Sequence, residues 1–359
     1  MNILQVIPNL HIGGAERFVC ELSIALNRIE NIHCEILSLY DLTEKDILYS
    51  TTKENNIKIH SLGKKIGRDI KMFYLIYKFI KNGKYDVVHS HIGAIKYMLL
   101  SVLLLRKVRF VATIHSDAKF ESGGGLEKFI KKIIFKWNWC IPVTISEESF
   151  LSFEEFYHKS TVMIPNGVSG FKGNRDTSIN KKEGEILFIH PASCQPVKNQ
   201  KLLFSAFKRL KNKYRNIRLL WYGSINHNQS LFDELSSYFD EGIRYAGVHQ
   251  DIRSAIVVAD AICLSSKIEG LPMTIIEAFS VGKPVLSTPV GGCRNIIQNR
   301  VNGLLSKSLQ ENDYYDMLEE FILMTDEERK QMNNSATETF EEYKISKIAQ
   351  TYVNLYKKR

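Results

Sequence analysis

The strongest constraint on the fold is an alternation of two patterns that runs along the whole chain. Short apolar, β-branched segments alternate with longer stretches whose apolar residues repeat every three or four positions, such as Phe18, Val19, Leu22, Ala25 and Leu26. The first pattern predicts strands and the second amphipathic helices. In the first half, strands are expected at residues 3–7, 34–39, 57–62, 85–89, 108–114, 141–145 and 162–164. Strands that alternate with helices predict βαβ units and a doubly wound parallel sheet, an α/β fold.

Residues 169–184 interrupt this alternation, because they hold few apolar residues and three glycines. We therefore expect a linker there. The alternation then restarts, with strands expected at residues 186–189, 218–222, 243–246, 261–265 and 285–287. With 359 residues, the chain is long enough for two domains. We expect one α/β domain at residues 1–168 and a second at 185–340. The tail from about residue 326 has a continuous helical pattern.

The charge balance indicates an anionic partner. The chain has 48 Lys and Arg against 39 Asp and Glu, a net charge of +9. Nucleic acid, membrane phosphate and a phosphorylated small molecule all satisfy that balance. Basic residues interleave with aromatic ones at residues 64–84 and 128–139, which suits an anionic membrane surface; the alternative is a solvated helix face above an apolar core. No nucleic-acid-reading motif accompanies these residues, so we expect no nucleic acid partner.

Three features predict where the protein is located, and the cysteine pattern among them suits a reducing compartment. The six cysteines are scattered singly, without a CxxC pair, which argues against a disulfide scaffold or a zinc site. The first residues have the pattern of a strand and lack the features of a signal peptide. The longest apolar run, residues 97–105, is about half the ~20 residues that a membrane span needs. We expect a cytoplasmic protein that at most touches the inner face of the membrane.

Two candidate site features follow expected strands of the first half. Gly13 and Gly14 come after the first strand and before a helix, where glycines let a ligand approach backbone amides. Such a pair also forms simple tight turns. His115 comes directly after the strand at residues 108–114, so we expect it at the sheet edge where ligands bind. The alternative is a structural histidine.

Lys198 is the first candidate in the second half. It follows the strand at 186–189 and opens a helix with apolar residues at Leu202, Leu203, Ala206 and Leu210. A lysine in the first turn opposes the helix dipole unless an anion shares the site. Lys198 is therefore a phosphate-binding candidate; the alternative is a flexible surface lysine.

A second cluster follows the strand at residues 261–265. Pro272 is expected at the first helical position, so the loop Glu269-Gly270-Leu271 before it presents free amides to an anion. Glu269 and Glu277 then place two carboxylates around a nucleotide-sized gap. Such carboxylates accept hydrogen bonds from sugar and ribose hydroxyls. The alternative is a pair of glutamates favoured only by the helix dipole.

With these motifs the chain resembles the retaining glycosyltransferases of the GT-B fold, family 4, which include bacterial capsule, O-antigen and lipopolysaccharide sugar transferases. The resemblance spans nearly the whole chain. The motifs that carry it are Gly13-Gly14-Ala-Glu-Arg, Thr113-Ile-His115, Ile164-Pro-Asn166-Gly-Val, Pro196-Val-Lys198-Asn-Gln, Glu269-Gly-Leu-Pro272 with Glu277, Pro289-Val-Gly291-Gly292 and Asn302-Gly303-Leu-Leu. It implies two Rossmann-like domains facing a central cleft, and a helix at residues 341–359 that returns to the first domain.

The resemblance also implies roles for these residues. His115, Lys198 and Glu269 would be catalytic: His115 contacts the donor sugar, Lys198 neutralises the diphosphate and Glu269 holds sugar hydroxyls. Glu277 would hold the ribose. Gly13, Gly14, Ser193, Gly270, Leu271 and Pro272 would complete the donor site. The implied reaction moves a sugar from a nucleotide diphosphate, with UDP favoured, to a glycan or polyprenyl-diphosphate-linked acceptor, without metal or cofactor. Acceptor residues are expected around His91 and in Gly123-Gly124-Gly125.

Three departures from the family pattern leave alternatives open. Ser193 stands where the family usually has a second diphosphate-binding arginine, which Arg17 or Arg294 is expected to replace. The usual Gly-x-Gly is reduced to Gly223-Ser224-Ile225, and Asn295 stands in place of a glutamate. One alternative function is therefore a catalytically silent nucleotide-sugar-binding subunit. The other is a nucleotide-sugar epimerase, which is the weaker one because those enzymes lack the Glu269-Gly-Leu-Pro pattern.

Overall fold

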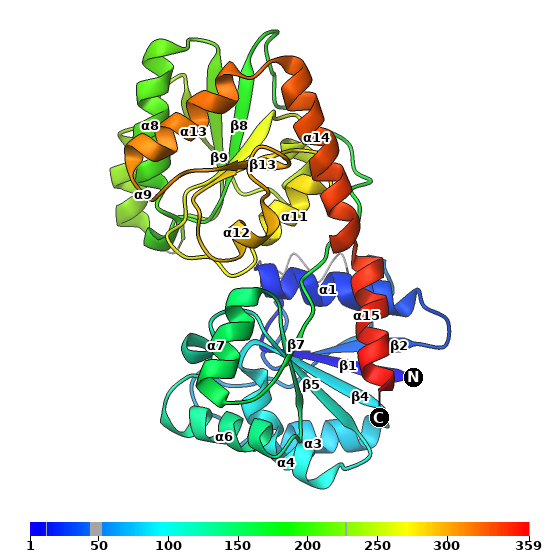
Figure 1. Ribbon diagram of the computed structural model, residues 1–359. Coiled ribbons are helices and arrows are strands. Elements are labelled where there is room, and N and C mark those ends of the chain that lie inside the picture. Colours follow the sequence, from blue (N-terminus) through cyan, green and yellow to red (C-terminus); the bar gives the residue numbers. More distant parts are fainter. Residues whose placement is uncertain (12, 44–51, 227, 359) are drawn as a thin grey trace. The chain divides into compact units, whose positions relative to one another are not determined.

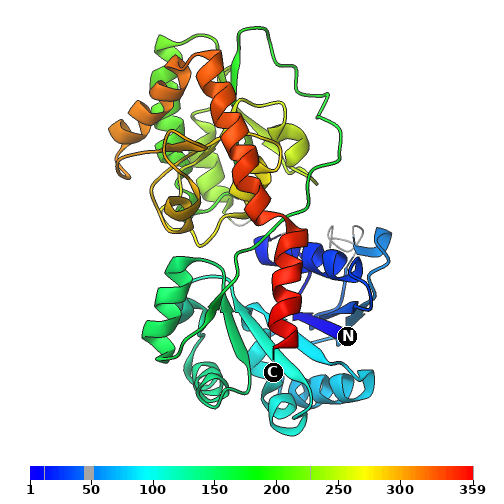
Figure 2. The same ribbon diagram turned by 45° about the vertical axis from the view of Figure 1, so that its right-hand side comes forward.

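The chain folds into two compact units. The computed structural model describes residues 1–11, 13–43, 52–226 and 228–358. The first unit consists of Met1–Ser169 with Tyr343–Arg359, and the second of Gly170–Glu342. Each unit contains one parallel sheet flanked by helices (Figures 1 and 2). The prediction of an α/β fold with two doubly wound sheets is confirmed.

The first unit holds a seven-stranded sheet in the order β3-β2-β1-β4-β5-β6-β7. Its strands are β1 (Asn2–Ile7), β2 (His33–Ser38), β3 (Ile59–Ser61), β4 (Val87–His91), β5 (Arg109–Ile114), β6 (Ile141–Thr144) and β7 (Val162–Met163). The winding direction reverses between β1 and β4, so the loops after these strands diverge. Ligands of doubly wound sheets bind at such a point, beyond the carboxyl ends of the strands.

Helices cover both faces of this sheet. They are α1 (Gly14–Asn27), α3 (Lys71–Gly83), the 3-10 helix η1 (Ile92–Met98), α4 (Leu99–Leu104), α5 (Ala118–Glu121), α6 (Gly125–Lys136), α7 (Glu147–Tyr157) and α15 (Ile345–Lys357). Strand alternation sends Leu4 and Val6 into the core beneath α3 and α6, and Ile7 into the core beneath α1. Helix α15 packs beside α1 (Figure 1). Its apolar stripe is buried throughout, at Ile345, Ile348, Ala349, Tyr352, Leu355 and Tyr356.

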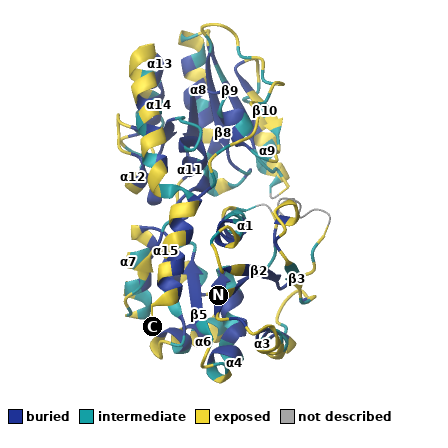
Figure 3. Cartoon of the chain, turned by 90° about the vertical axis from the view of Figure 1, so that its right-hand side faces the viewer, coloured by how far each residue is buried: buried dark blue, intermediate teal, exposed yellow. Residues whose placement is uncertain are grey.

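The second unit holds a six-stranded sheet in the order β10-β9-β8-β11-β12-β13. Its strands are β8 (Ile186–Pro191), β9 (Ile217–Tyr222), β10 (Ile243–Gly247), β11 (Ala261–Leu264), β12 (Val285–Ser287) and β13 (Gly303–Leu305). Here the winding reverses between β8 and β11. Every residue of these two strands is buried, which is typical of a parallel sheet covered on both faces (Figure 3).

The helices of the second unit are η2 (Pro196–Lys198), α8 (Gln200–Lys213), α9 (Gln229–Ser236), α10 (Arg253–Ile256), α11 (Met273–Phe279), α12 (Gly292–Ile296), α13 (Glu311–Leu323) and α14 (Asp326–Phe340), followed by η3 (Glu341–Tyr343). Helices α8 and α13 pack together over Phe188 and Trp221, and the predicted apolar residues of α8 are buried. Residues 170–185 contain no helix or strand, but they bond to this unit. Lys181 Nζ, for example, lies 2.7 Å from Asp260 Oδ1.

The structure corrects four details of the predicted elements. Strand β4 extends to His91, two residues beyond the expected end, so its polar end is part of the sheet. Strand β3 is shorter than expected, and β13 was not predicted because three residues give too short a pattern. The tail is not one helix: α14 ends at Phe340, and a 3-10 turn separates it from α15. Among the described residues, no helix combines the length and the apolar character needed to cross a membrane.

Candidate functional site

Lys198 and Glu269 form an ion pair in the second unit. Lys198 Nζ lies 2.7 Å from Glu269 Oε1, and the hydroxyl of Ser266 donates to the same oxygen at 2.5 Å. Glu269 is the more buried partner, with 11% of its side chain exposed. Among the described residues, no hydrogen bond reaches the other carboxylate oxygen, Oε2. Two residues that the sequence identified separately therefore form one site with a free carboxylate oxygen.

The two strands on either side of the winding reversal position this pair. Lys198 follows β8 and Glu269 follows β11, and these strands are neighbours in the sheet. Bonds between the two loops fix their separation: the Ser265 hydroxyl donates to the Lys198 carbonyl at 2.8 Å, and the Lys267 amide donates to the Val197 carbonyl at 2.8 Å. The pair thus lies where ligands of doubly wound sheets bind.

The loop after Glu269 presents unused amides. Within the described part of the chain, the amides of Glu269, Gly270 and Leu271 donate to no protein acceptor. The Gly270 carbonyl accepts from the Gly292 amide at 2.7 Å. A Cβ at Gly292 would lie 2.1 Å from the Gly270 carbonyl oxygen. A glycine at 292 is therefore required for this loop to pack where it does.

Local details differ from the sequence predictions at two positions. Lys198 does not lie in the first turn of α8: it ends the 3-10 turn η2, and α8 begins at Gln200 after Asn199 adopts a left-handed conformation. Pro272 is the residue before α11, not its first residue, since the helix begins at Met273. Glu277 lies in the second turn of α11, as expected, and its side chain is buried.

Ser193 and Gly223 lie together beside this site. The Ser193 hydroxyl accepts from Gln195 Nε2 at 3.0 Å, and its carbonyl accepts from Gln200 Nε2 at 2.8 Å. A Cβ at Gly223 would lie 2.0 Å from the Ala192 carbonyl oxygen, which accounts for the retained first glycine of Gly223-Ser224-Ile225. Arg294 is on α12, where its Nε donates to the Pro289 carbonyl.

The first unit contains a chain of hydrogen-bonded imidazoles at the ends of β4 and β5, in which His91 is buried and His115 is partly buried. His115 Nε2 lies 3.1 Å from His91 Nδ1, and His91 Nε2 lies 2.7 Å from Gln5 Oε1. Since the Gln5 oxygen accepts, His91 Nε2 carries the proton and His91 Nδ1 accepts from His115 Nε2. The remaining nitrogen of His115, Nδ1, is buried and has no partner among the described residues. His115 therefore presents an unprotonated acceptor.

A second chain of bonds connects the sheet to α15. His89 Nδ1 lies 2.7 Å from the Tyr356 hydroxyl, and His89 Nε2 lies 2.7 Å from Thr113 Oγ1, which in turn lies 3.2 Å from the Tyr352 hydroxyl.

Burial lowers the pKa of His115 to about 3. Burial and the neighbouring imidazoles lower the pKa values of His89 and His91 well below their usual range. The three imidazoles are therefore neutral at physiological pH.

Gly13 and Gly14 lie at the beginning of α1, after β1. Gly13 is the residue before the helix, and its carbonyl accepts from the Arg17 amide at 3.0 Å. A Cβ at Gly13 would lie 2.2 Å from Glu16 Oε2, so this carboxylate packs onto the glycine. Burial raises the pKa of Glu16. An acidic side chain thus lies at the helix start where the sequence predicts the approach of a ligand.

The expected acceptor segments meet at one pocket of the first unit. Gly93, which follows His91 by two residues, and Gly124 of the glycine triplet both line it. His91 itself is fully buried and does not line the pocket. Lys64, Arg68 and Lys96 line it as well, although the sequence indicated only a general basic stretch around two of them.

Three polar residues of the sites were missed from the sequence. Gln5 and His89 lie within apolar strand segments, where a single polar residue gives no signal of which face it occupies. His190, in β8, is also buried: its Nδ1 lies 2.7 Å from the Cys263 carbonyl oxygen, and its Nε2 has no partner among the described residues. Burial lowers the pKa of His190 to about 4.

Across the described ranges, no three acidic, histidine or cysteine side chains converge as ligands for a metal.

Two doubly wound sheets, one with a lysine–glutamate pair and open amides at its winding reversal, define a GT-B glycosyltransferase. Family models support this assignment over both units: "Glycosyltransferase Family 4" matches residues 12–169, and "Glycosyl transferases group 1" matches residues 172–339. Together the two models cover most of the chain, which therefore belongs to the family of glycosyltransferase enzymes that they describe.

Curated relatives match most or nearly all of the chain. The chain is 24% identical to the Campylobacter jejuni GalNAc-alpha-(1->4)-GalNAc-alpha-(1->3)-diNAcBac-PP-undecaprenol alpha-1,4-N-acetyl-D-galactosaminyltransferase, over 99% of this chain and 98% of the relative. It is 22% identical to the Escherichia coli UDP-Gal:alpha-D-GlcNAc-diphosphoundecaprenol alpha-1,3-galactosyltransferase, over 80% of each chain. Both relatives are named for acceptors that carry a diphosphoundecaprenol group.

Solved structures share the fold. A glycosyltransferase of Rickettsia africae superimposes with a TM-score of 0.82 at 20% identity, over 99% of this chain and 97% of the other. The Anabaena protein HepE in complex with UDP superimposes with a TM-score of 0.82 at 16% identity, over 99% of both chains. At these identities the likeness concerns the fold alone.

Proposed function

We propose that the protein transfers a sugar from a nucleotide diphosphate donor, with UDP favoured, to a polyprenyl-diphosphate-linked acceptor, with retention of anomeric configuration. The observation that carries the proposal is the Lys198–Glu269 pair at the winding reversal of the second sheet. The acceptors named for the Campylobacter and Escherichia relatives support the polyprenyl diphosphate. The product belongs to surface polysaccharide synthesis, of the capsule or lipopolysaccharide kind.

The donor diphosphate binds at Lys198 in this proposal. When the sugar leaves, charge develops on the diphosphate, and a fixed ammonium stabilises it without reorganisation. The amides of Gly270 and Leu271 donate to phosphate oxygens, since they have no protein acceptor among the described residues. Glu277 holds the ribose. We expect no metal in this role, because the cation and the amides supply the positive charge.

The donor sugar binds at Glu269. Its Oε1 is held by Lys198 and Ser266, so Oε2 remains to accept from sugar hydroxyls. His115, in the first unit, offers an unprotonated Nδ1 as an acceptor for a sugar hydroxyl. The proposal also places the protein at the inner face of the membrane, supported by the exposed basic and aromatic residues of α3 and α6.

Turnover of a panel of UDP-, GDP- and ADP-sugars with a short polyprenyl-diphosphate-linked glycan tests the proposal. We expect turnover of at least one donor, and loss of that turnover in Lys198→Met and Glu269→Gln. Lys201→Met is the matched control, because Lys201, on α8, forms an exposed ion pair with Glu234 of α9. Retained turnover in the first two variants would refute the assigned roles.

A silent binding subunit is the second candidate, and Ser193 is the observation that favours it. Its hydroxyl cannot replace a guanidinium on the diphosphate. Binding of a nucleotide sugar without turnover for every donor and acceptor would establish this alternative. Restoration of turnover by Ser193→Arg would show that the missing charge is the cause.

A further inference from the structure

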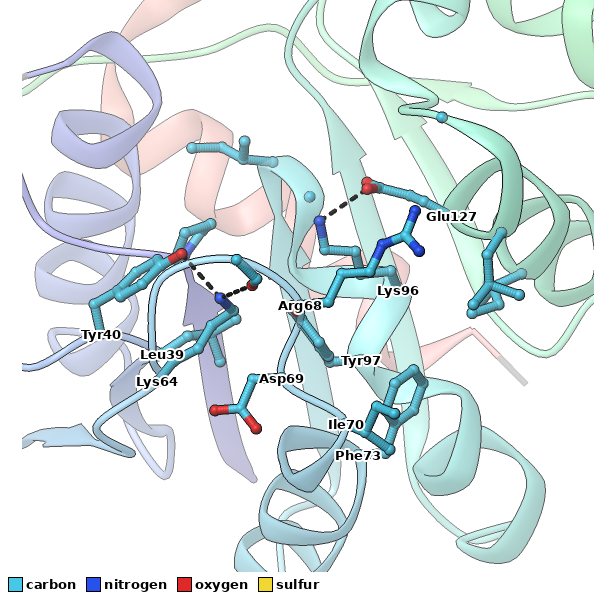
Figure 4. A pocket seen from close by; sticks show the side chains of 17 residues that line it. Leu39, Tyr40, Lys64, Arg68, Asp69, Ile70, Phe73, Lys96, Tyr97 and Glu127 are labelled. Atoms are coloured by element: carbon cyan, nitrogen blue, oxygen red, sulfur yellow. Dashed lines mark hydrogen bonds and ion pairs between the residues drawn. The ribbon is translucent and has the colours of Figure 1, made fainter.

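A pocket of about 540 Å³ opens at the carboxyl edge of the first unit's sheet (Figure 4). The loop between β3 and α3 forms one wall, and η1 and α6 form the other. Its volume lies in the range of small-molecule sites, about 300–1,000 Å³. Apolar side chains form much of its surface, among them Leu39, Phe73, Ile92 and Ile130. Two of the expected acceptor segments line it, at Gly93 and Gly124, but no donor-site role proposed above uses it.

Lys64 places a positive charge inside the pocket. It is 8% exposed, and its Nζ donates to the Tyr40 hydroxyl at 2.9 Å and to the carbonyls of Lys65 and Gly67 at 2.8 and 2.7 Å. Burial lowers its pKa, but the tyrosine hydroxyls raise it more, so that the pKa is above its ordinary value. The ammonium is therefore charged and bonded only to neutral oxygens. A buried charge without a carboxylate favours an anion nearby.

The other charges of the pocket leave a positive excess. Arg68 is exposed and has no ion-pair partner among the described residues. Lys96 Nζ lies 2.8 Å from Glu127 Oε2, but Glu127 is shared with Lys131, whose Nζ lies 2.9 Å from Oε1. The carboxylate of Asp69, the second acidic residue of the lining, accepts from two backbone amides of its own segment. Neither carboxylate neutralises Lys64 or Arg68.

The pocket opens onto exposed apolar side chains. Ile70 and Leu126 line it from opposite walls and are 83% and 59% exposed. Ile66 and Phe129, on the same two segments, are 96% and 61% exposed. Apolar side chains concentrated beside a ligand pocket indicate a surface that is covered in the working state. A ligand with an anionic head and a hydrocarbon tail satisfies both halves of this arrangement.

We propose that the pocket binds the diphosphate and the first isoprenoid units of a lipid-linked acceptor, with the phosphates bonded to Arg68 and Lys96 beside the charge of Lys64, and the hydrocarbon across Ile70 and Leu126. The inference rests on the proposed function and adds the site that distinguishes this acceptor from a free sugar. A bilayer headgroup alone does not account for the pocket, because Lys64 lies inside it and is nearly inaccessible from a flat surface.

Calorimetric titration of the full-length protein with farnesyl diphosphate tests the phosphate-binding part of the pocket. Binding is expected to weaken about ten- to a hundredfold in Arg68→Gln, because a charge-assisted contact to phosphate is lost. Lys78→Gln is the matched control: it removes an exposed cation of α3 outside this pocket, and binding is expected to be unchanged. Equal weakening in both variants would overturn the proposal in favour of unspecific surface charge.

The apolar part of the pocket, which would bind the hydrocarbon, is tested with inorganic diphosphate, farnesol and the variant Ile70→Asp. Farnesyl diphosphate is expected to bind at least tenfold tighter than either fragment, and Ile70→Asp to remove this advantage while leaving inorganic diphosphate unaffected. Equal affinity for farnesyl diphosphate and inorganic diphosphate would overturn the lipid assignment and leave an anion site. Competition by vesicles of anionic lipid as effective as farnesyl diphosphate would instead assign the pocket to the membrane.

UDP titration of the same variants separates this inference from the proposed function. UDP binding is expected to be unchanged in Arg68→Gln and Ile70→Asp, since both lie in the first unit. If the wild-type protein turns over a donor but farnesyl diphosphate does not bind, the pocket assignment fails and the proposed function stands. If farnesyl diphosphate binds as expected and no donor is turned over, the pocket assignment stands and the proposed function fails.

Discussion

The buried imidazoles predict that acid destabilises the first unit. His89, His91 and His115 are neutral in the folded state, with pKa values below the ordinary value of about 6.5. Below pH 6.5 the unfolded chain therefore binds more protons than the folded one. Stability is full above pH 6.5 and falls as the pH drops toward the folded-state pKa values.

The magnitude follows from this difference. Each neutral imidazole removes about 1.4 kcal/mol of stability per pH unit well below pH 6.5, or about 2 kcal/mol between pH 7 and pH 5. Three such groups remove up to about 6 kcal/mol, which is comparable to the total stability of a domain. Burial raises the pKa values of Glu16 and Glu121, which opposes this loss. Because both glutamates are present in every variant, a comparison between variants cancels their contribution to the pH dependence.

Hydrogen exchange of peptides from β1, β4 and β5, read by mass spectrometry from pH 7 to pH 5, measures the free energy of opening. His89→Gln is expected to lower stability at pH 7 through lost bonds, but to reduce the fall between pH 7 and pH 5 by about 2 kcal/mol. His33→Gln is the control, because it removes an exposed imidazole of β2. An unchanged pH dependence in His89→Gln would refute the reasoning.

Three further predictions concern the donor site. Gly292→Ala is expected to cost about 1–3 kcal/mol in thermal unfolding and to abolish UDP binding, because its Cβ overlaps the Gly270 carbonyl; Gly170→Ala, with open space around it, should change neither. Ser266→Ala is expected to lower kcat/KM about tenfold by removing a hydrogen bond to the Glu269 carboxylate, and an unchanged rate would show that Lys198 alone orients it. Turnover in excess EDTA should equal turnover without it, and loss that Mg²⁺ restores would reveal a metal requirement.

Most of the fold was predictable because its signals are local. The spacing of the apolar residues in α1 and α15 predicts which face of each helix is buried. The exceptions are elements with too few residues to show a period, such as β13. The break before α15 was missed because the residues around Tyr343 continue the helical pattern while the backbone adopts a 3-10 turn.

The sites were predictable as parts but not as arrangements. Lys198 and Glu269 stood out individually, yet their bond joins residues 71 positions apart and depends on β8 and β11 being neighbours. Gln5 and His91 could not be linked to His115 in advance, because in a strand buried on both faces no alternation of polarity shows which side chains share a face. Lys64 looked like one of many surface lysines, and only the folded loop makes it a buried charge.

The position of α15 determines the order in which the units can finish folding during synthesis. The second unit is one continuous stretch, Gly170–Glu342, and can assemble as soon as that stretch has left the ribosome. The first unit begins earlier but depends on the segment that emerges after the second unit. Until Tyr352 and Tyr356 arrive, His89 and Thr113 lack their hydroxyl partners and α1 lacks a neighbouring helix. The unit synthesised first is thus completed last, because its final helix emerges only after the whole of its neighbour.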